Sequence, residues 1–171
     1  MTSGGQGWSS NSLGKGLWIL IASPLLSIAT GSIIGAGAFA ILSLTASGGS
    51  PSDLFRAYMA SLLYSSLVTV PFGSVAGISA ALIIIALGRG SHRGASLNRW
   101  LSTGGTLGAA VGLACPLFLL ILGFRGNGES ILSWILFYGI TGGVSGVVVG
   151  VALGALAWRE FGQRAEPRRA G

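Results

Sequence analysis

The sequence predicts an all-α membrane protein, a four-transmembrane-helix bundle of two antiparallel hairpins with glycine-zipper packing. Three observations predict this fold. The 171 residues are 51% hydrophobic and only 8% charged, whereas a soluble domain carries about 25% charged residues. Four apolar runs are each longer than the ~20 residues that cross a bilayer. In the last run glycine recurs every fourth residue, at Gly142, Gly146, Gly150 and Gly154.

The glycine spacing of this last run places its four glycines on one face of a helix. Each interior glycine costs a helix in water about 1 kcal/mol relative to alanine. In a bilayer the backbone has no other hydrogen-bond partner, so the helix forms anyway. The flat glycine face then lets a second helix approach closely. The small-residue spacing resembles that of mitochondrial inner-membrane translocase subunits; the resemblance covers this spacing alone, includes no specific motif, and implies no residue role here.

The first part of the chain reads as a flexible polar tail over residues 1–14, followed by a transmembrane domain over residues 15–158. The first helix is expected at about 17–45. A secretory signal peptide is the alternative, with Lys15 as its basic region. Its apolar region would span about 7–15 residues, and the uncharged run here is nearly twice that length, which favours a membrane helix.

The second helix is expected at about 51–87. Ser50 fits its N-cap, Pro51 its first position and Asp53 its first turn. Pro71 lies in the middle of the run and lacks the amide hydrogen that a helix requires there. We therefore expect a kink at Pro71.

The third and fourth helices are expected at about 97–122 and 129–158, joined by a short glycine-containing loop. Ser96 fits the N-cap of the third helix, and Pro116 is a second candidate for a kink. Residues 159–171 form a charged tail, which we expect to be cytoplasmic and either solvated or in contact with lipid headgroups.

The basic residues predict the orientation of the four spans. Cytoplasmic loops carry an excess of Lys and Arg, and eight of the ten basic residues fall on the side that holds both termini. The sequence therefore predicts a multi-pass integral membrane protein with its N- and C-termini in the cytoplasm. Those eight are Lys15, Arg89, Arg93, Arg99, Arg159, Arg164, Arg168 and Arg169, against Arg56 and Arg125 on the far side.

Counting residues from the flanking cations predicts which small residues meet. Gly108 lies nine residues after Arg99, and Gly150 lies nine residues before Arg159, so these two glycines should face each other. The same count pairs Gly31 with Gly73, and Ser27 with Gly77. These surfaces could instead face a partner protein or a second copy of the chain. The predicted helix-packing residues are Gly31, Gly35, Gly73, Gly77, Gly104, Gly108, Gly112, Gly142, Gly146, Gly150 and Gly154.

Groups that carry chemistry are sparse in the predicted spans. No ionisable side chain falls within the membrane core, and such charges usually mark proton relays and ion pathways. One histidine and one cysteine, His92 and Cys115, cannot supply a tetrahedral metal site. A catalytic serine would need a base, and the spans hold none. We expect no enzyme activity, no cofactor, no metal and no nucleic acid; Arg89, Arg93, Arg99 and Arg159 are expected to contact lipid headgroups.

The functional expectation follows from these features together. Small-residue faces and the absence of catalytic groups favour a protein that acts through helix packing, as an accessory or assembly subunit of a larger membrane complex. Its expected partners are membrane lipids and either other membrane-protein subunits or further copies of itself. The alternative is an oligomeric pore or transporter for small or uncharged solutes. Hydroxyl side chains gathered on one face with the prolines would favour that alternative, and along the sequence they look scattered.

Overall fold

The computed structural model describes residues 10–50, 52–90, 95–121, 123 and 131–162. Helix α1 spans Ser10–Ser47, α2 Asp53–Arg89, α3 Leu97–Leu113, α4 Cys115–Ile121 and α5 Ile131–Ala157, and a π-helix, η1, follows at Trp158–Gly162. Four of these segments are long and apolar enough to cross a membrane: Gly16–Ala46, Asp53–Arg89, Leu97–Ile121 and Ile131–Gly162. The described part of the chain is therefore all-helical, with the composition of a multi-pass membrane protein.

The helix boundaries differ from the predicted ones at several ends. Helix α1 begins at Ser10, so residues 10–14 are helical and do not belong to a flexible tail. Extending an existing helix adds one hydrogen bond for each residue that is fixed, whereas starting a new helix is costly. For the same reason the last helix continues past residue 158 into η1. Residues 1–9 and 163–171 of the two predicted tails lie outside the described residues.

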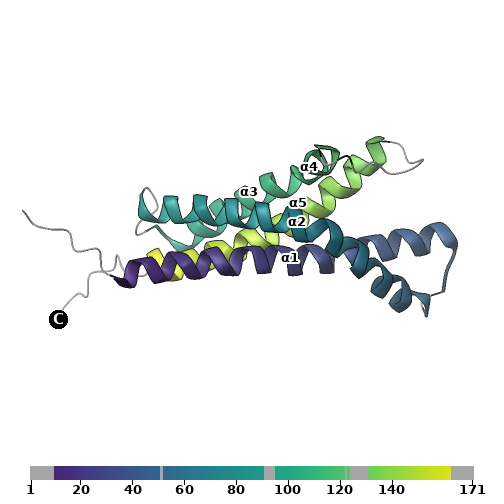
Figure 1. Cartoon of the computed structure of the whole chain (residues 1–171), viewed down its shortest axis with the longest axis horizontal. Coiled ribbons are helices and arrows are strands. Elements are labelled where there is room, and N and C mark those ends of the chain that lie inside the picture. The colour runs from purple at the N-terminus through teal and green to yellow at the C-terminus, as the bar shows by residue number, and fades with distance from the viewer. Residues whose placement is uncertain (1–9, 51, 91–94, 122, 124–130, 163–171) are drawn as a thin grey trace, which may run out of the picture.

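The prolines have different effects on the helices. Pro24 and Pro71 lie inside α1 and α2 without ending them, and Figure 1 shows α2 changing direction near its middle. The predicted third helix is divided into α3 and α4, with Ala114 between them and Pro116 at the second residue of α4. A helix that continued through this point would leave the carbonyl of Gly112 without its donor, because proline has no amide hydrogen.

The helices pack mainly as two pairs, α1 with α2 and α3 with α5. In Figure 1 the start of α1, the end of α2, the start of α3 and the end of α5 lie at one end of the molecule. This end holds Arg89, Arg99 and Arg159 and is called the arginine end below. The two pairs meet there in an apolar core that includes Ile84, Trp100 and Leu153. A second, smaller core around Cys115, Leu119 and Trp134 lies further along the bundle.

Candidate functional site

Helices α3 and α5 approach each other through their glycines. A Cβ atom added at Gly108 would overlap the carbonyl oxygen of Gly146 and lie 3.0 Å from the Cα of Gly150. Gly104 meets the backbone of Gly150 and Gly154 in the same way, and Gly112 meets that of Gly142. The two helices are therefore in backbone-to-backbone contact along this face, and any side chain larger than hydrogen would force them apart.

Helices α1 and α2 pack differently: their glycines contact larger residues of the other helix, including Pro24, and not other glycines. A Cβ at Gly77 would lie 2.7 Å from the Cα of Pro24, and one at Gly31 would lie 2.9 Å from the Cγ2 of Thr69. Gly73 meets the backbone between Ser27 and Ile28. The predicted pairing of Gly31 with Gly73 is therefore wrong by about one helical turn, as is that of Gly77 with Ser27.

Gly35 completes this α1–α2 face, where its added Cβ would lie 3.2 Å from the Cβ of Ser65. The glycine faces of both helices are therefore occupied within the chain.

Hydroxyl groups join α1 to α2 across this contact. The buried Ser23 hydroxyl donates to the carbonyl oxygen of Gly77 at 2.6 Å. The hydroxyls of Ser32 and Thr69 lie 2.7 Å apart, and Ser65 donates to the Ser32 carbonyl at 3.2 Å. Such interhelical hydrogen bonds contribute about 0.6 kcal/mol each on average inside a membrane. Sequence reasoning did not identify Ser23 or Ser32, although both lie four residues from other small residues on the same face.

The arginine end combines exposed charge with a closed aromatic core. Arg89, Arg99 and Arg159 are exposed, and the remaining predicted headgroup residue, Arg93, lies outside the described residues. Beneath them the rings of Trp100 and Phe161 stack with centroids 6.3 Å apart. The Phe161 ring packs against Gly88, where a Cβ would lie 2.6 Å from it. Contact of Phe161 with Gly88 of α2 and Trp100 of α3 joins the two helix pairs at this end.

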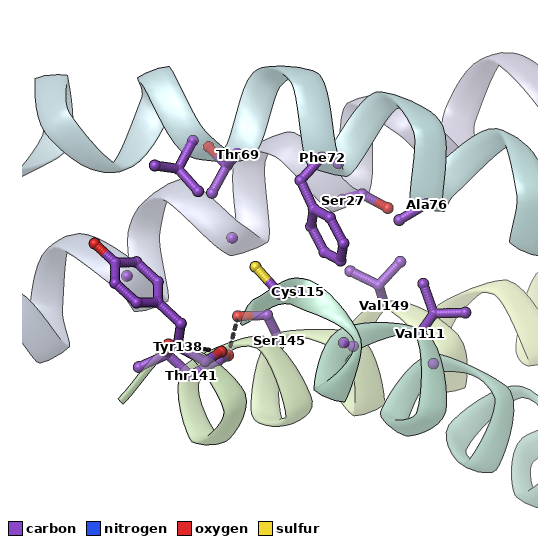
Figure 2. A pocket seen from close by; sticks show the side chains of 18 of the residues that line it. Ser27, Thr69, Phe72, Ala76, Val111, Cys115, Tyr138, Thr141, Ser145 and Val149 are labelled. Atoms are coloured by element: carbon purple, nitrogen blue, oxygen red, sulfur yellow. Dashed lines mark hydrogen bonds between the residues drawn. The ribbon is translucent and has the colours of Figure 1, made fainter. Parts of the chain in front are cut away.

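A partly open cavity of about 440 Å³ lies between the α1–α2 pair and the α3–α5 pair. Figure 2 shows Phe72 and Ala76 of α2 pointing into this space from one side, and Cys115, Val111 and Val149 from the other. Its volume falls in the range of about 300–1,000 Å³ that is typical of small-molecule sites. The glycine faces of α3 and α5 form part of its wall.

The cavity gathers hydroxyl side chains that look scattered along the sequence. Ser61, Ser65 and Thr69 follow each other at four-residue spacing on α2, and Thr141 and Ser145 do so on α5. This corrects the sequence reading, and the four-residue spacing was the signal that could have revealed it. Most of these hydroxyls bond within the protein: Ser61 to Ala57, Ser65 to Ser61, Thr141 to Phe137 and Ser145 to Thr141, at 2.6–2.7 Å from the carbonyl oxygens.

The described residues contain no group of three or more His, Cys, Asp or Glu side chains that could hold a metal ion. Cys115 is buried and forms no disulfide. Its sulfur faces the cavity (Figure 2). The cavity wall therefore consists of apolar groups, hydroxyls and a single thiol.

Comparison with known proteins adds no family. No protein-family model, no curated protein and no solved structure matches this chain.

Proposed function

We propose that this chain is an accessory or assembly subunit of a larger membrane complex, which acts through helix packing and has no catalytic activity. In this proposal the helices form two antiparallel hairpins, the α3–α5 contact is a glycine zipper, and both termini lie in the cytoplasm. The observation that supports it best is the backbone contact of Gly104, Gly108 and Gly112 with α5. Such a contact gives a rigid scaffold and contributes no reactive group.

Charge supports the same proposal. The described parts of α1–α5 carry charged side chains only near the helix ends, at Lys15, Asp53, Arg56, Arg89 and Arg99. Between these ends their ionisable groups are Cys115 and the tyrosines. A permeating ion would therefore find no counter-charge along the spans. The exposed arginines at one end suit the anionic cytoplasmic face of a membrane.

Native extraction tests the assembly role. The full chain is extracted in a mild detergent, and the mass and composition of its particle are measured. We expect a particle heavier than one chain, containing other membrane-protein subunits or further copies of this one. A Gly37→Leu variant should keep this particle, because a Cβ at Gly37 has no neighbour within 4 Å. A Gly108→Leu variant should lose it, because the α3–α5 scaffold is forced apart. A particle of a single chain would contradict the proposal.

Cysteine labelling tests the orientation. Single cysteines replace Gly49, between α1 and α2, or Gly90, directly after α2, with the buried Cys115 changed to alanine. A reagent that cannot cross the membrane should label intact cells only at position 49. Labelling of position 90 from outside would reverse the proposed orientation.

The second candidate function is an oligomeric pore or transporter for small or uncharged solutes. The cavity favours it, because five serine and threonine residues of α2 and α5 line one space between the helix pairs. Reconstitution distinguishes the two candidates. The purified chain alone in liposomes should give no conductance and no solute flux if it is an accessory subunit. Robust flux of an uncharged solute from the isolated chain would favour the transporter.

A further inference from the structure

We propose that the cavity between the two helix pairs binds one acyl chain of a bilayer phospholipid. This inference goes beyond the accessory role, because it assigns a ligand to a space inside the chain and does not depend on a protein partner. Three properties of the cavity support this inference: its narrow shape, the hydrogen bonds that its hydroxyls already make, and its closed end.

The cavity is long and narrow. On α5 its lining runs from Phe137 to Leu153, which corresponds to about 24 Å at about 1.5 Å per residue. Spread over that length, the volume of about 440 Å³, which is the space open to the centres of water-sized spheres, has a mean cross-section of about 18 Å². Adding a sphere radius of about 1.4 Å on each side makes the space about 8 Å across. An α-helix with its side chains is about 10–12 Å across. A single extended hydrocarbon chain therefore fits this space, whereas a helix of a partner protein does not.

Five hydroxyls of the wall already bond within the protein, and those of Ser27, Tyr64 and Tyr138 are the others that line it. Ser61, Ser65, Thr141 and Ser145 each donate their proton to a carbonyl of their own helix, and Thr69 pairs with Ser32. A buried water molecule needs about two to four polar partners. The rest of the wall is mostly aliphatic, aromatic or glycine. The wall therefore favours an apolar occupant over a column of water.

The arginine end of the cavity is closed. The lining ends at Ile84 on α2 and Leu153 on α5, and these two side chains pack with Trp100 in one core. All three are at most 1% exposed. A water-filled pathway would have to pass this core, whereas a lipid chain that enters sideways from the bilayer does not. An empty space of this size would also forfeit dispersion contacts along its wall, and acyl chains surround the protein on every side.

Photocrosslinking of the full chain tests the assignment. The parent protein is reconstituted in phosphatidylcholine vesicles that contain a small fraction of phosphatidylcholine with a diazirine within one acyl chain. After illumination, the modified residues are mapped by mass spectrometry. We expect adducts on cavity residues such as Val111 and Thr141, in addition to outward residues such as Leu63. Adducts confined to outward residues would overturn the proposal, and this result does not depend on the folding of any variant.

Filling the cavity provides a matched pair of variants. Ala76→Phe places a ring in the space into which Ala76 points (Figure 2). Ala86→Phe adds the same ring at an exposed position of the same helix that does not line the cavity. We expect at least a fivefold loss of cavity adducts in the first variant and none in the second. Equal adduct yields in two folded variants would contradict a bound chain.

The reactivity of Cys115 tests whether water enters the cavity, because Cys115 is the single cysteine of the chain and faces the cavity. A charged methanethiosulfonate reagent added to the reconstituted parent should leave Cys115 unmodified. Rapid modification would show that the cavity is hydrated and would overturn the proposal in favour of a water-filled pathway.

Discussion

Replacing Gly108 with alanine tests the close contact of α3 and α5 with the smallest possible change. The added Cβ would overlap the Gly146 carbonyl oxygen and lie 3.0 Å from the Cα of Gly150. Both neighbours are backbone atoms and cannot rotate away, so the helices must separate. Even a gap of about 0.5–1 Å forfeits a quarter to a half of each atom pair's dispersion energy. We expect Gly108→Ala to lower the free energy of unfolding by about 1–3 kcal/mol, as overpacking does in other cores.

Gly37→Ala is the matched control on another helix. Its Cβ would meet nothing within 4 Å, and alanine is favoured over glycine in a helix by up to about 1 kcal/mol. This variant should therefore be as stable as the parent or slightly more stable. The free energies of unfolding are compared by denaturant titration of the full chain in mixed micelles. If Gly108→Ala is as stable as Gly37→Ala, the two helices do not touch through their glycines.

Two further predictions concern the α1–α2 pair. With Cys115 changed to alanine, a Gly31→Cys/Thr69→Cys variant should form a disulfide under mild oxidation. The added Cβ of residue 31 lies 3.4 Å from that of Thr69, close to the roughly 3.5–4.5 Å that a disulfide spans. A Gly31→Cys/Gly73→Cys variant should not crosslink. If this variant crosslinks and the Gly31→Cys/Thr69→Cys variant does not, the pairing of Gly31 with Gly73 predicted from the sequence is correct. Ser23→Ala removes the 2.6 Å hydrogen bond from Ser23 to the Gly77 carbonyl of α2. It should lower the free energy of unfolding by about 0.6 kcal/mol, and at most by about 1.7 kcal/mol. An unchanged free energy of unfolding would show that this bond does not stabilise the fold.

Much of the fold could be predicted from the sequence because a bilayer restricts the possibilities. Apolar runs of this length must be helical, so four candidate spans could be identified directly. The interruption before Pro116 could also be anticipated, since proline lacks an amide hydrogen. The boundary at Ser10 could not be predicted, because a polar segment gains helical structure only from the apolar helix that it continues.

The register of α1 against α2 shows why counting from cations failed. Gly77 contacts Ser23 and Pro24. When this antiparallel register is extended along both helices to the arginine end, the backbone of Arg89 lies about one helical turn beyond that of Lys15. The Arg89 side chain reaches back over this distance, because its guanidinium lies 3.5 Å from the Cβ position of Gly16. Long basic side chains extend along a helix to reach the interface. A flanking cation therefore fixes the depth of a helix only to within about a turn.

Glycine has two different roles in the two helix pairs, and glycines of both pairs line the cavity. In the α3–α5 pair glycine meets glycine, so the backbones touch and the pair is narrow. In the α1–α2 pair glycine accommodates serine, threonine and proline of the other helix, and hydrogen bonds then hold the two together. Each pair uses its small residues to bring its own two helices together. Larger side chains make contact where the pairs join, such as Phe39 with Phe137 and Phe72 with Phe118. Glycines of both pairs also line the join and have no side chain to fill it, so a long space remains there. An acyl chain in that space would complete the packing of the bundle and keep it impermeable to ions, as a subunit that acts through packing alone requires.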